Sequence, residues 1–268
     1  MSTLETIKIL REKSGAGMVD CKKALEESGN DIEKAVEILR KKGIAKAAKR
    51  GEREAGEGVI KVDVGQGNKE GYIVEINSET DFVARNEQFQ DFANQVMDLI
   101  KEKKPNNLDE LLSLEMDEMT VKEKLGNLSG VIGEKLDIKK FNILKTEGTI
   151  AVYSHMGGKI GVLVSLDKSG ENDLAYEIAM QIAATDPKCI SPEELAEEDV
   201  NKEKEIYKEQ LLKEGKPENI IEKIMEGKIN KYFEEVCLIK QEYIKEEKKK
   251  VEDILGGAKV EKFIRYSM

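Results

Sequence analysis

Apolar residues at helical spacing dominate the N-terminal part of the chain, residues 1–45. Breaks at Ser14–Gly17 and at Gly29–Asn30 divide this part into three segments. The apolar positions of the segments are Leu4, Ile7 and Leu10, then Cys21, Ala24 and Leu25, and finally Ile32, Ala35, Val36 and Leu39. The pattern predicts a small bundle of three helices, the last of which runs to about Gly43.

The hydrophobic period changes after residues 46–58, a stretch that is first basic and then rich in Gly and Glu, typical of a helix tail passing into a linker. Apolar and polar residues then alternate over 59–64 and 71–76, which predicts two strands joined by a turn. Further along, the spacing predicts helices at 89–100, 121–136 and 174–184 and strands at 149–153 and 160–166. We therefore expect an α+β core with antiparallel sheets.

The segment from Pro192 to Phe233 has a different composition, dominated by Glu and Lys. Gly215–Pro217 splits it at a point suited to a sharp reversal. After the split, apolar residues recur at spacings of four and three, as in a coiled-coil seam, at Met225, Ile229, Tyr232, Val236 and Ile239. Before the split, a facing stripe is available from Val200, Tyr207 and Leu211. We expect an antiparallel helical hairpin, followed by a charged helix at 246–255 and a strand at 260–266.

Composition narrows the classes of function. The chain has 268 residues, 37% of them charged, and a formal net charge of −10. No apolar run approaches the roughly 20 residues of a membrane-spanning helix, and the N-terminus lacks a signal-peptide pattern. One histidine and three cysteines far apart in the sequence argue against a zinc site, a disulfide framework and most histidine-dependent enzymes. We expect a cytoplasmic protein.

Three features could carry chemistry but have simpler interpretations. Gly65–Gly67 and Gly157–Gly158 lie between predicted strands and fit hairpin turns better than phosphate-binding loops, which open a helix. The basic run from Lys41 to Arg53 lacks interleaved aromatic residues, and the negative net charge disfavours nucleic acid binding. His155 is the single histidine, and no Ser or Asp stands out as its partner in a nucleophilic triad.

The segment Glu75–Asn86, EINSETDFVARN, is the unusual one, because a predicted strand ends in polar residues and an apolar pair stands in the turn before a long helix. One interpretation is that Thr80 or Asp81 caps a helix while Phe82 packs back on its first turns. The alternative is an apolar side chain presented beside a carboxylate on a rigid corner, as at binding hot spots. The residues alone leave both interpretations open.

Four long motifs follow one another along the chain: LREKSGAGMVDCKKAL at 10–25, EINSETDFVAR at 75–85, YSHMGGKIGVLV at 153–164 and GKPENIIEKIMEGKINKYFEEVCLIKQEY at 215–243. Together they resemble the signatures of the bacterial elongation factor Ts family. The resemblance implies a three-helix, ubiquitin-associated-like N-terminal domain, an α+β core of two subdomains, and a coiled-coil hairpin inserted in the second. The expected boundaries are 1–55 for the N-terminal domain and linker, 56–145 for the first subdomain, 146–192 and 234–268 for the second, and 193–233 for the hairpin.

By this resemblance the chain is a guanine-nucleotide exchange factor that binds elongation factor Tu·GDP and promotes GDP release. The family segment that dislodges Mg²⁺ from the partner is matched here by Thr80, Asp81, Phe82 and Val83. Other partner contacts of the family are matched by Arg11, Met18, Val19, Ile132, Gly133 and His155. The resemblance implies no catalytic residue, metal or cofactor in this chain, and no direct contact with nucleic acid or membrane.

Two other classes of function stay open from the sequence. The seam from Met225 to Ile239 also suits a scaffold protein that dimerises through its hairpin. A nucleotide-dependent enzyme would bind GTP or ATP by itself, although neither Gly-rich stretch has the spacing of a phosphate-binding loop. The oligomeric state is likewise open, with a homodimer and a heterotetramer with the partner among the candidates.

Overall fold

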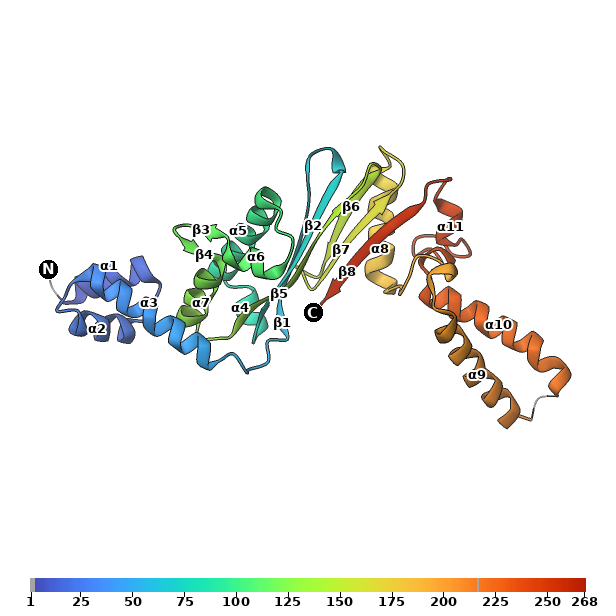
Figure 1. Cartoon of the computed structure of the whole chain (residues 1–268), viewed down its shortest axis with the longest axis horizontal. Coiled ribbons are helices and arrows are strands. Elements are labelled where there is room, and N and C mark those ends of the chain that lie inside the picture. The colour runs from blue at the N-terminus through green and yellow to red at the C-terminus, as the bar shows by residue number, and fades with distance from the viewer. Residues whose placement is uncertain (1–2, 216) are drawn as a thin grey trace.

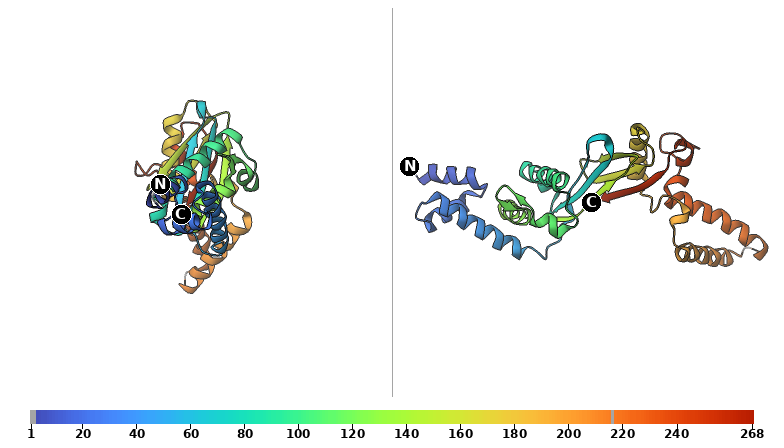
Figure 2. Two further views of the ribbon diagram at one scale, coloured as in Figure 1. Left: turned by 90° about the vertical axis from the view of Figure 1, so that its left-hand side faces the viewer. Right: turned by 45° about the horizontal axis from the view of Figure 1, so that its top comes forward.

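The computed structural model describes residues 3–215 and 217–268. The molecule is elongated, with the N-terminal helices at one end, the main sheets in the middle and a pair of long helices extending from the other end (Figure 1). The further views in Figure 2 agree with this arrangement. The chain is an α+β protein whose main sheets are antiparallel, as the sequence predicts.

The predicted N-terminal helices are confirmed as α1 (Thr3–Ser14), α2 (Met18–Glu27) and α3 (Ile32–Lys49). Their buried core consists of Ile7, Leu10, Ala16, Cys21, Ala24, Leu25 and Ala35. α3 does not end near Gly43 but continues to Lys49, because it packs along a helix of the core, α7 (Val121–Ile132). At their crossing a Cβ atom on Gly130 would lie 2.5 Å from the Gly43 Cα atom, so the two helix backbones touch.

The first sheet has the strand order β1–β2–β5, with bounds β1 (Glu57–Val64), β2 (Glu70–Ser78) and β5 (Leu136–Lys145). Its central strand β2 is buried along nearly its whole length. A shared core joins this sheet to α7 and to α4 (Asp81–Ala84), α5 (Glu87–Lys103) and α6 (Leu108–Ser113). A short ribbon leads into α7, formed by β3 (Glu115–Met116) and β4 (Met119–Thr120).

Strand β5 is absent from the sequence prediction, which instead extended a helix to Leu136. The helix α7 ends at Ile132 because Gly133 takes the left-handed conformation, with φ 91°, and closes its last turn. The strand itself carries a bulge opposite Glu75, which lets Lys139 and Lys140 both reach that carboxylate, at 3.1 and 3.3 Å. The bulge and the exposed lysines of this edge strand interrupt the alternation that reveals a strand in a sequence.

The second sheet has the order β6–β7–β8, with bounds β6 (Thr149–His155), β7 (Ile160–Leu166) and β8 (Val260–Ser267). The helix α8 (Asn172–Thr185) packs on β6 and β7 and shares a buried core with them. These elements confirm the strands predicted at 149–153, 160–166 and 260–266 and the helix predicted at 174–184.

The two sheets pack face to face through Ile60, Ile73, Leu144, Ile150, Leu163 and Tyr266. Glycines allow the close approach. A Cβ atom on Gly71 would lie 2.7 Å from Ile150 Cγ2, and one on Gly161 would lie 2.4 Å from Ile60 Cγ2. Glycine is therefore needed at both positions for this separation of the sheets.

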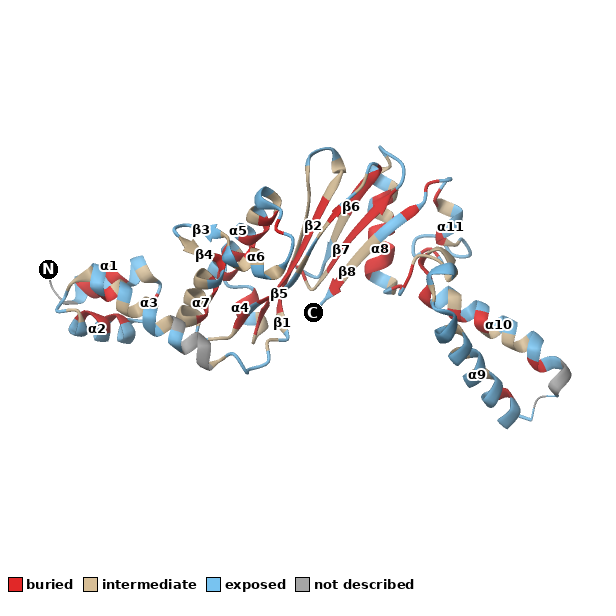
Figure 3. Ribbon diagram, in the orientation of Figure 1, coloured by how far each residue is buried: buried red, intermediate tan, exposed pale blue. Residues whose placement is uncertain are grey.

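The long helices α9 (Glu197–Lys213) and α10 (Glu218–Val236) lie side by side beyond the second sheet (Figure 1). From the predicted seam, the buried residues are Ile229, Tyr232, Val236 and the facing Leu211, whereas most of α9 is exposed (Figure 3). The expected reversal at 215–217 includes Lys216, which is outside the described residues. Coiled-coil packing, the likeness of α1–α3 to a ubiquitin-associated domain, and the domain boundaries stay predictions.

The predicted helix at 246–255 is wrong over its first half. Within this range only α11 (Val251–Ile254) is helical. Two short 3₁₀ turns occur earlier in the chain, η2 (Pro192–Glu194) and η3 (Leu238–Lys240). The Tyr243 amide instead donates to the Lys249 carbonyl oxygen at 2.8 Å, and Val251 donates to Gln241 at 3.0 Å. These bonds close a loop, so the local helical propensity of the charged residues does not decide the structure.

The close contact of the sheets yields a first test. Gly161→Ala should lower the free energy of unfolding by about 1–3 kcal/mol, because the added methyl group overpacks against Ile60. Urea unfolding followed by circular dichroism measures the change. Gly126→Ala in α7 is the matched control, since a Cβ atom there meets no other atom within 4 Å and alanine favours a helix. Equal losses in the two variants would contradict the packing argument.

A second test concerns Glu70 at the start of β2. The Lys104 ammonium group at 2.6 Å, the Tyr72 hydroxyl at 2.5 Å and Lys145 at 3.1 Å lower the pKa of Glu70 to about 2. A lowered pKa in the folded state contributes stability above the usual carboxyl pKa of 4.5, and this stability is lost as the pH falls through about 2.

Replacing Glu70 with glutamine should therefore lower the free energy of unfolding by about 1 kcal/mol at pH 7, a modest value because the pairs are partly solvated. The difference from the wild type should shrink as the pH is lowered from 4.5 towards 2. Urea titrations at a series of pH values measure it, with the exposed Glu209→Gln of α9 as the control. A difference that is constant with pH would contradict the assignment.

Candidate partner-binding site

β2 leads directly into a short helix, and hydrogen bonds fix the turn between them. The Ser78 hydroxyl donates to the Thr80 carbonyl oxygen at 2.9 Å. Thr80 is the N-cap of α4, and its hydroxyl oxygen accepts from the Val83 amide at 3.5 Å. Asn86 caps α5 in the same way. The chain thus passes from strand to helix over residues 79–86, which we call the Phe82 corner.

Residues Glu134 and Lys135, which follow α7, form hydrogen bonds with the start of the Phe82 corner. Glu134 accepts from Thr80 twice, from the backbone amide at 3.0 Å and from the hydroxyl at 2.7 Å. Lys135 donates its backbone amide to Glu79 Oε1 at 2.6 Å, and Arg53 Nη1 lies 3.2 Å from the same oxygen. The Lys135 amide, with the Arg53 guanidinium, lowers the pKa of Glu79. Glu79 and Thr80, at the start of the corner, are therefore tied to distant parts of the chain.

Phe82 and Val83 are neighbours with opposite environments. Val83 is 9% exposed and joins the core, whereas Phe82 is 82% exposed, the highest value among the exposed large hydrophobic residues described. Beside it, Asp81 forms an ion pair with Arg85 at 2.9 Å. Thr80 caps the helix, as the first interpretation of the sequence expects, but Phe82 does not pack back on the helix as that interpretation requires. The corner instead has the arrangement of the second interpretation, in which an apolar side chain is exposed beside a carboxylate.

The N-terminal helices carry a second set of candidates, the exposed Arg11, Met18 and Val19. The turn between α1 and α2 approaches the core. A Cβ atom on Gly15 would lie 3.2 Å from Gln88 Nε2 and 3.3 Å from Val131 Cγ1. This turn, which precedes Met18, therefore lies beside the start of α5 and the end of α7.

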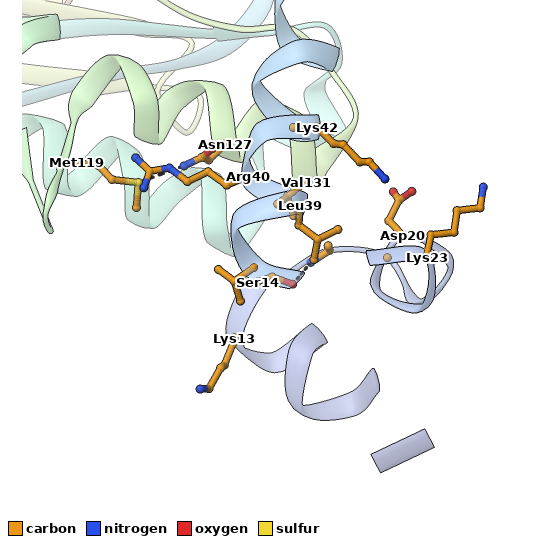
Figure 4. A pocket seen from close by; sticks show the side chains of 15 residues that line it. Lys13, Ser14, Asp20, Lys23, Leu39, Arg40, Lys42, Met119, Asn127 and Val131 are labelled. Atoms are coloured by element: carbon orange, nitrogen blue, oxygen red, sulfur yellow. Dashed lines mark hydrogen bonds between the residues drawn. The ribbon is translucent and has the colours of Figure 1, made fainter. Parts of the chain in front are cut away.

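A pocket of about 240 Å³ lies between the N-terminal helices and α7 (Figure 4). Its lining includes Lys13, Asp20, Lys23, Arg40, Met119 and Asn127. Near it, Arg40 lies 3.5 Å from Glu123, and Arg50 donates to the Ser129 carbonyl oxygen at 2.9 Å. These contacts, with the Gly43–Gly130 crossing, dock the N-terminal helices on the core.

Ile132 and Gly133 lie at the end of α7. Ile132 packs against the core and is partly buried, while Gly133 is exposed. The next residue is Glu134, which binds Thr80. The structure therefore brings Ile132 and Gly133 next to the Phe82 corner, although they are distant in the sequence.

His155 is the last residue of β6, at the turn that leads into β7. Its ring stacks with that of Tyr153 at 5.9 Å, and the Tyr153 hydroxyl lies 3.1 Å from His155 Nδ1. Tyr176 of α8 meets Tyr153 edge to face at 5.7 Å. The hairpin turn contacts the first sheet, because the Ile60 amide donates to the Gly158 carbonyl oxygen at 2.7 Å.

The two Gly-rich stretches of the sequence have structural roles in the fold. Gly65–Gly67 lies in the turn between β1 and β2, and Gly157–Gly158 lies in the turn between β6 and β7, so neither opens a long helix. Within the described residues, no three His, Cys, Asp or Glu side chains are grouped so as to hold a metal ion. In the same part of the chain, no helix combines the length and apolar character needed to cross a bilayer.

A comparison with protein families decides the identity. Residues 79–268 match the family model described as elongation factor TS. The chain belongs to the elongation factor Ts family. It is therefore a member of a family of translation elongation factors, and the match contains the Phe82 corner, Ile132, Gly133 and His155. Arg11, Met18 and Val19 precede the matched residues.

Sequence reasoning missed the residues that hold this site in place. Glu134, Lys135 and Arg53 fix the Phe82 corner but lie far from it in the sequence, and a single sequence carries no signal for such pairings. Tyr153 and Tyr176 beside His155 were likewise not singled out. Met156, 72% exposed in the hairpin turn, could have been noticed as an apolar residue between turn residues.

The two hydrogen bonds from Thr80 to Glu134 predict that the backbone of the Phe82 corner is rigid. Glu134→Ala should lower the free energy of unfolding by about 1–3 kcal/mol, because the Thr80 amide and hydroxyl lose their acceptor. Amide hydrogen exchange at residues 80–84 should become faster. Glu134→Gln, which keeps one good acceptor, should have an intermediate effect, and Asp91→Asn on the exposed face of α5 serves as the charge control. Unchanged exchange at the Phe82 corner in Glu134→Ala would contradict this role.

Proposed function

We propose that this protein is a guanine-nucleotide exchange factor that binds elongation factor Tu·GDP and promotes GDP release, so that GTP can bind during translation elongation. The observation that carries the proposal is Phe82, exposed on a corner whose other groups are capped, paired or buried. Family membership supports the choice of partner. The proposed action is cytoplasmic and uses no catalytic residue, metal or cofactor of this chain.

In the proposed mechanism Phe82 enters the nucleotide domain of the partner beside its Mg²⁺ site. A bound Mg²⁺ offsets the charge of the GDP phosphates at close range. Displacing the elements that hold this ion loosens the nucleotide. Thr80 and Val83 keep Phe82 in position, because one is bonded to Glu134 and the other is packed in the core.

The energetic demand on such a mechanism is moderate. Coupling between two binding sites is reciprocal, so the nucleotide must weaken the binding of the exchange factor as much as the factor weakens that of the nucleotide. A loss of nucleotide affinity of about a thousandfold corresponds to about 4 kcal/mol. Several contact regions can supply this energy more readily than one.

The other proposed contacts are compatible with one extended interface. Ile132 and Gly133 adjoin the Phe82 corner through Glu134, and the turn before Met18 packs near Val131. We propose that Arg11, Met18 and Val19 bind the nucleotide domain beside Phe82. His155, on the second sheet with exposed neighbours, would bind the partner away from the nucleotide.

The structure gives simpler roles to the sequence features that suggested a dimeric scaffold or a nucleotide-dependent enzyme. The apolar seam that suggested a dimeric scaffold is largely buried within one chain, where Ile229, Tyr232 and Val236 are each less than a tenth exposed. The Gly-rich stretches that suggested a nucleotide-dependent enzyme form hairpin turns. The proposed exchange needs no second copy of the chain, and it leaves a homodimer or a heterotetramer with the partner to be decided by sizing the complex.

Phe82→Ala tests the proposal. Truncation of a central aromatic contact costs about 2 kcal/mol of binding free energy, so stimulated GDP release should slow about 30-fold. Stopped-flow release of a fluorescent GDP analogue from elongation factor Tu measures the rate. Because Phe82 is exposed, its replacement should change the free energy of unfolding by less than about 0.5 kcal/mol.

Ile206→Ala is the matched control, since Ile206 is also an exposed apolar residue but lies on α9, far from the Phe82 corner. It should leave the exchange rate unchanged. Full exchange activity of Phe82→Ala would remove Phe82 from the mechanism. A wild-type chain that forms no complex with elongation factor Tu would refute the assignment itself.

A further inference from the structure

A pair of cysteines meets at the base of the long helices. Cys189 follows α8 and Cys237 follows α10, and the structure brings their Sγ atoms to 3.5 Å, although the sequence separates them widely. Both are free thiols and both are buried, at 8% and 0% exposed. The third cysteine, Cys21, lies in the N-terminal helices.

The backbone around the thiols is already paired. Cys189 and Cys237 form an isolated parallel bridge, in which the Leu238 amide donates to the Cys189 carbonyl oxygen at 2.9 Å and Lys188 donates to Val236 at 2.8 Å. Paired strands lie about 5 Å apart, which is within the Cα separation that a disulfide spans. The sulfur atoms need to approach by about 1.5 Å to reach the bond length of about 2.05 Å.

We propose that Cys189 and Cys237 are a redox modification site, at which a low-molecular-weight disulfide such as oxidised glutathione converts the two thiols into an intramolecular disulfide. The new bond closes the chain on itself between the residues that precede α9 and follow α10. It therefore locks the base from which this helical pair extends. This inference is independent of the exchange mechanism, which does not use either thiol.

The chemistry balances as two thiol–disulfide exchanges. The Cys189 thiolate attacks one sulfur atom of oxidised glutathione, which forms a mixed disulfide and releases one glutathione thiolate. The Cys237 thiolate then attacks the Cys189 sulfur, which forms the protein disulfide and releases the second glutathione. The two protons of the protein thiols pass to the two leaving thiolates, so the protein is oxidised by two electrons and glutathione disulfide is reduced.

Access decides which thiol reacts first. Cys189 has the greater exposure, and Cys237 is fully buried. Burial raises the pKa of both thiols, that of Cys237 to about 12, so the Cys189 thiolate forms more readily. Tyr232, Val236 and Leu195 surround the pair, so the oxidant reaches it only when the base of the helical pair opens.

Oxidation should be read out on the full chain. After incubation with oxidised glutathione and denaturation, the free thiols should fall from three to one per chain, and peptide mapping should find Cys189 joined to Cys237. Hydrogen exchange at the Leu238 amide should slow by about tenfold or more, because the cross-link opposes opening of the base. Dithiothreitol should reverse both changes. Three free thiols after oxidation, or a disulfide between chains, would overturn the proposal.

Single substitutions separate this pair from the third cysteine. Cys21→Ser should oxidise as the wild type does, and Cys189→Ser should keep both of its thiols after the same treatment. If circular dichroism shows that Cys189→Ser is poorly folded, the peptide map of oxidised Cys21→Ser tests the proposal by itself. The one intramolecular disulfide that this variant can form joins Cys189 to Cys237, and its absence would overturn the proposal. Rapid oxidation that joins Cys21 to either of the others in the wild type contradicts the inference.

Discussion

Close packing of the two sheets is the constraint on which the rest of the structure depends. Gly71 and Gly161 leave no room for a side chain, so the strands of one sheet lie directly on the apolar residues of the other. This contact fixes the hairpin of His155 against β1, whose neighbour β2 ends at the Phe82 corner. The distance between the proposed contact regions is therefore set by the core and not by flexible loops.

The Phe82 corner shows how partly buried hydrogen bonds position an exposed apolar group. Thr80 donates its amide and hydroxyl to Glu134, Glu79 accepts from the Lys135 amide, and Val83 anchors the corner in the core. A segment whose backbone is already held in one place loses less conformational freedom when it binds, and the loss of such freedom is a large cost of association. The exposure of Phe82 and the rigidity of its surroundings thus act together.

Local patterns predicted the elements well and their long-range contacts poorly. The helix α5 follows from apolar spacing because it buries one regular face, and β7 follows from a short apolar run because it is buried on both faces. Strand β5 is not predicted, because its bulge and lysines interrupt the alternation of apolar and polar residues. The predicted end of α3 is too early, because Gly43 lies at the crossing with α7 and does not end the helix. Thr80 is recognisable as a cap from the sequence, but no local pattern reveals its hydrogen bonds to the distant Glu134.

An exposed phenylalanine is not by itself evidence of binding, because single apolar side chains are common on protein surfaces. The argument rests on what surrounds Phe82. The next residue is buried, Asp81 is paired with Arg85, and Thr80 has its donors satisfied, so neither packing nor capping of the corner requires an aromatic side chain at this position. The exposure of Phe82 is therefore unexplained within the chain, and the proposed burial of its ring in a partner would account for it.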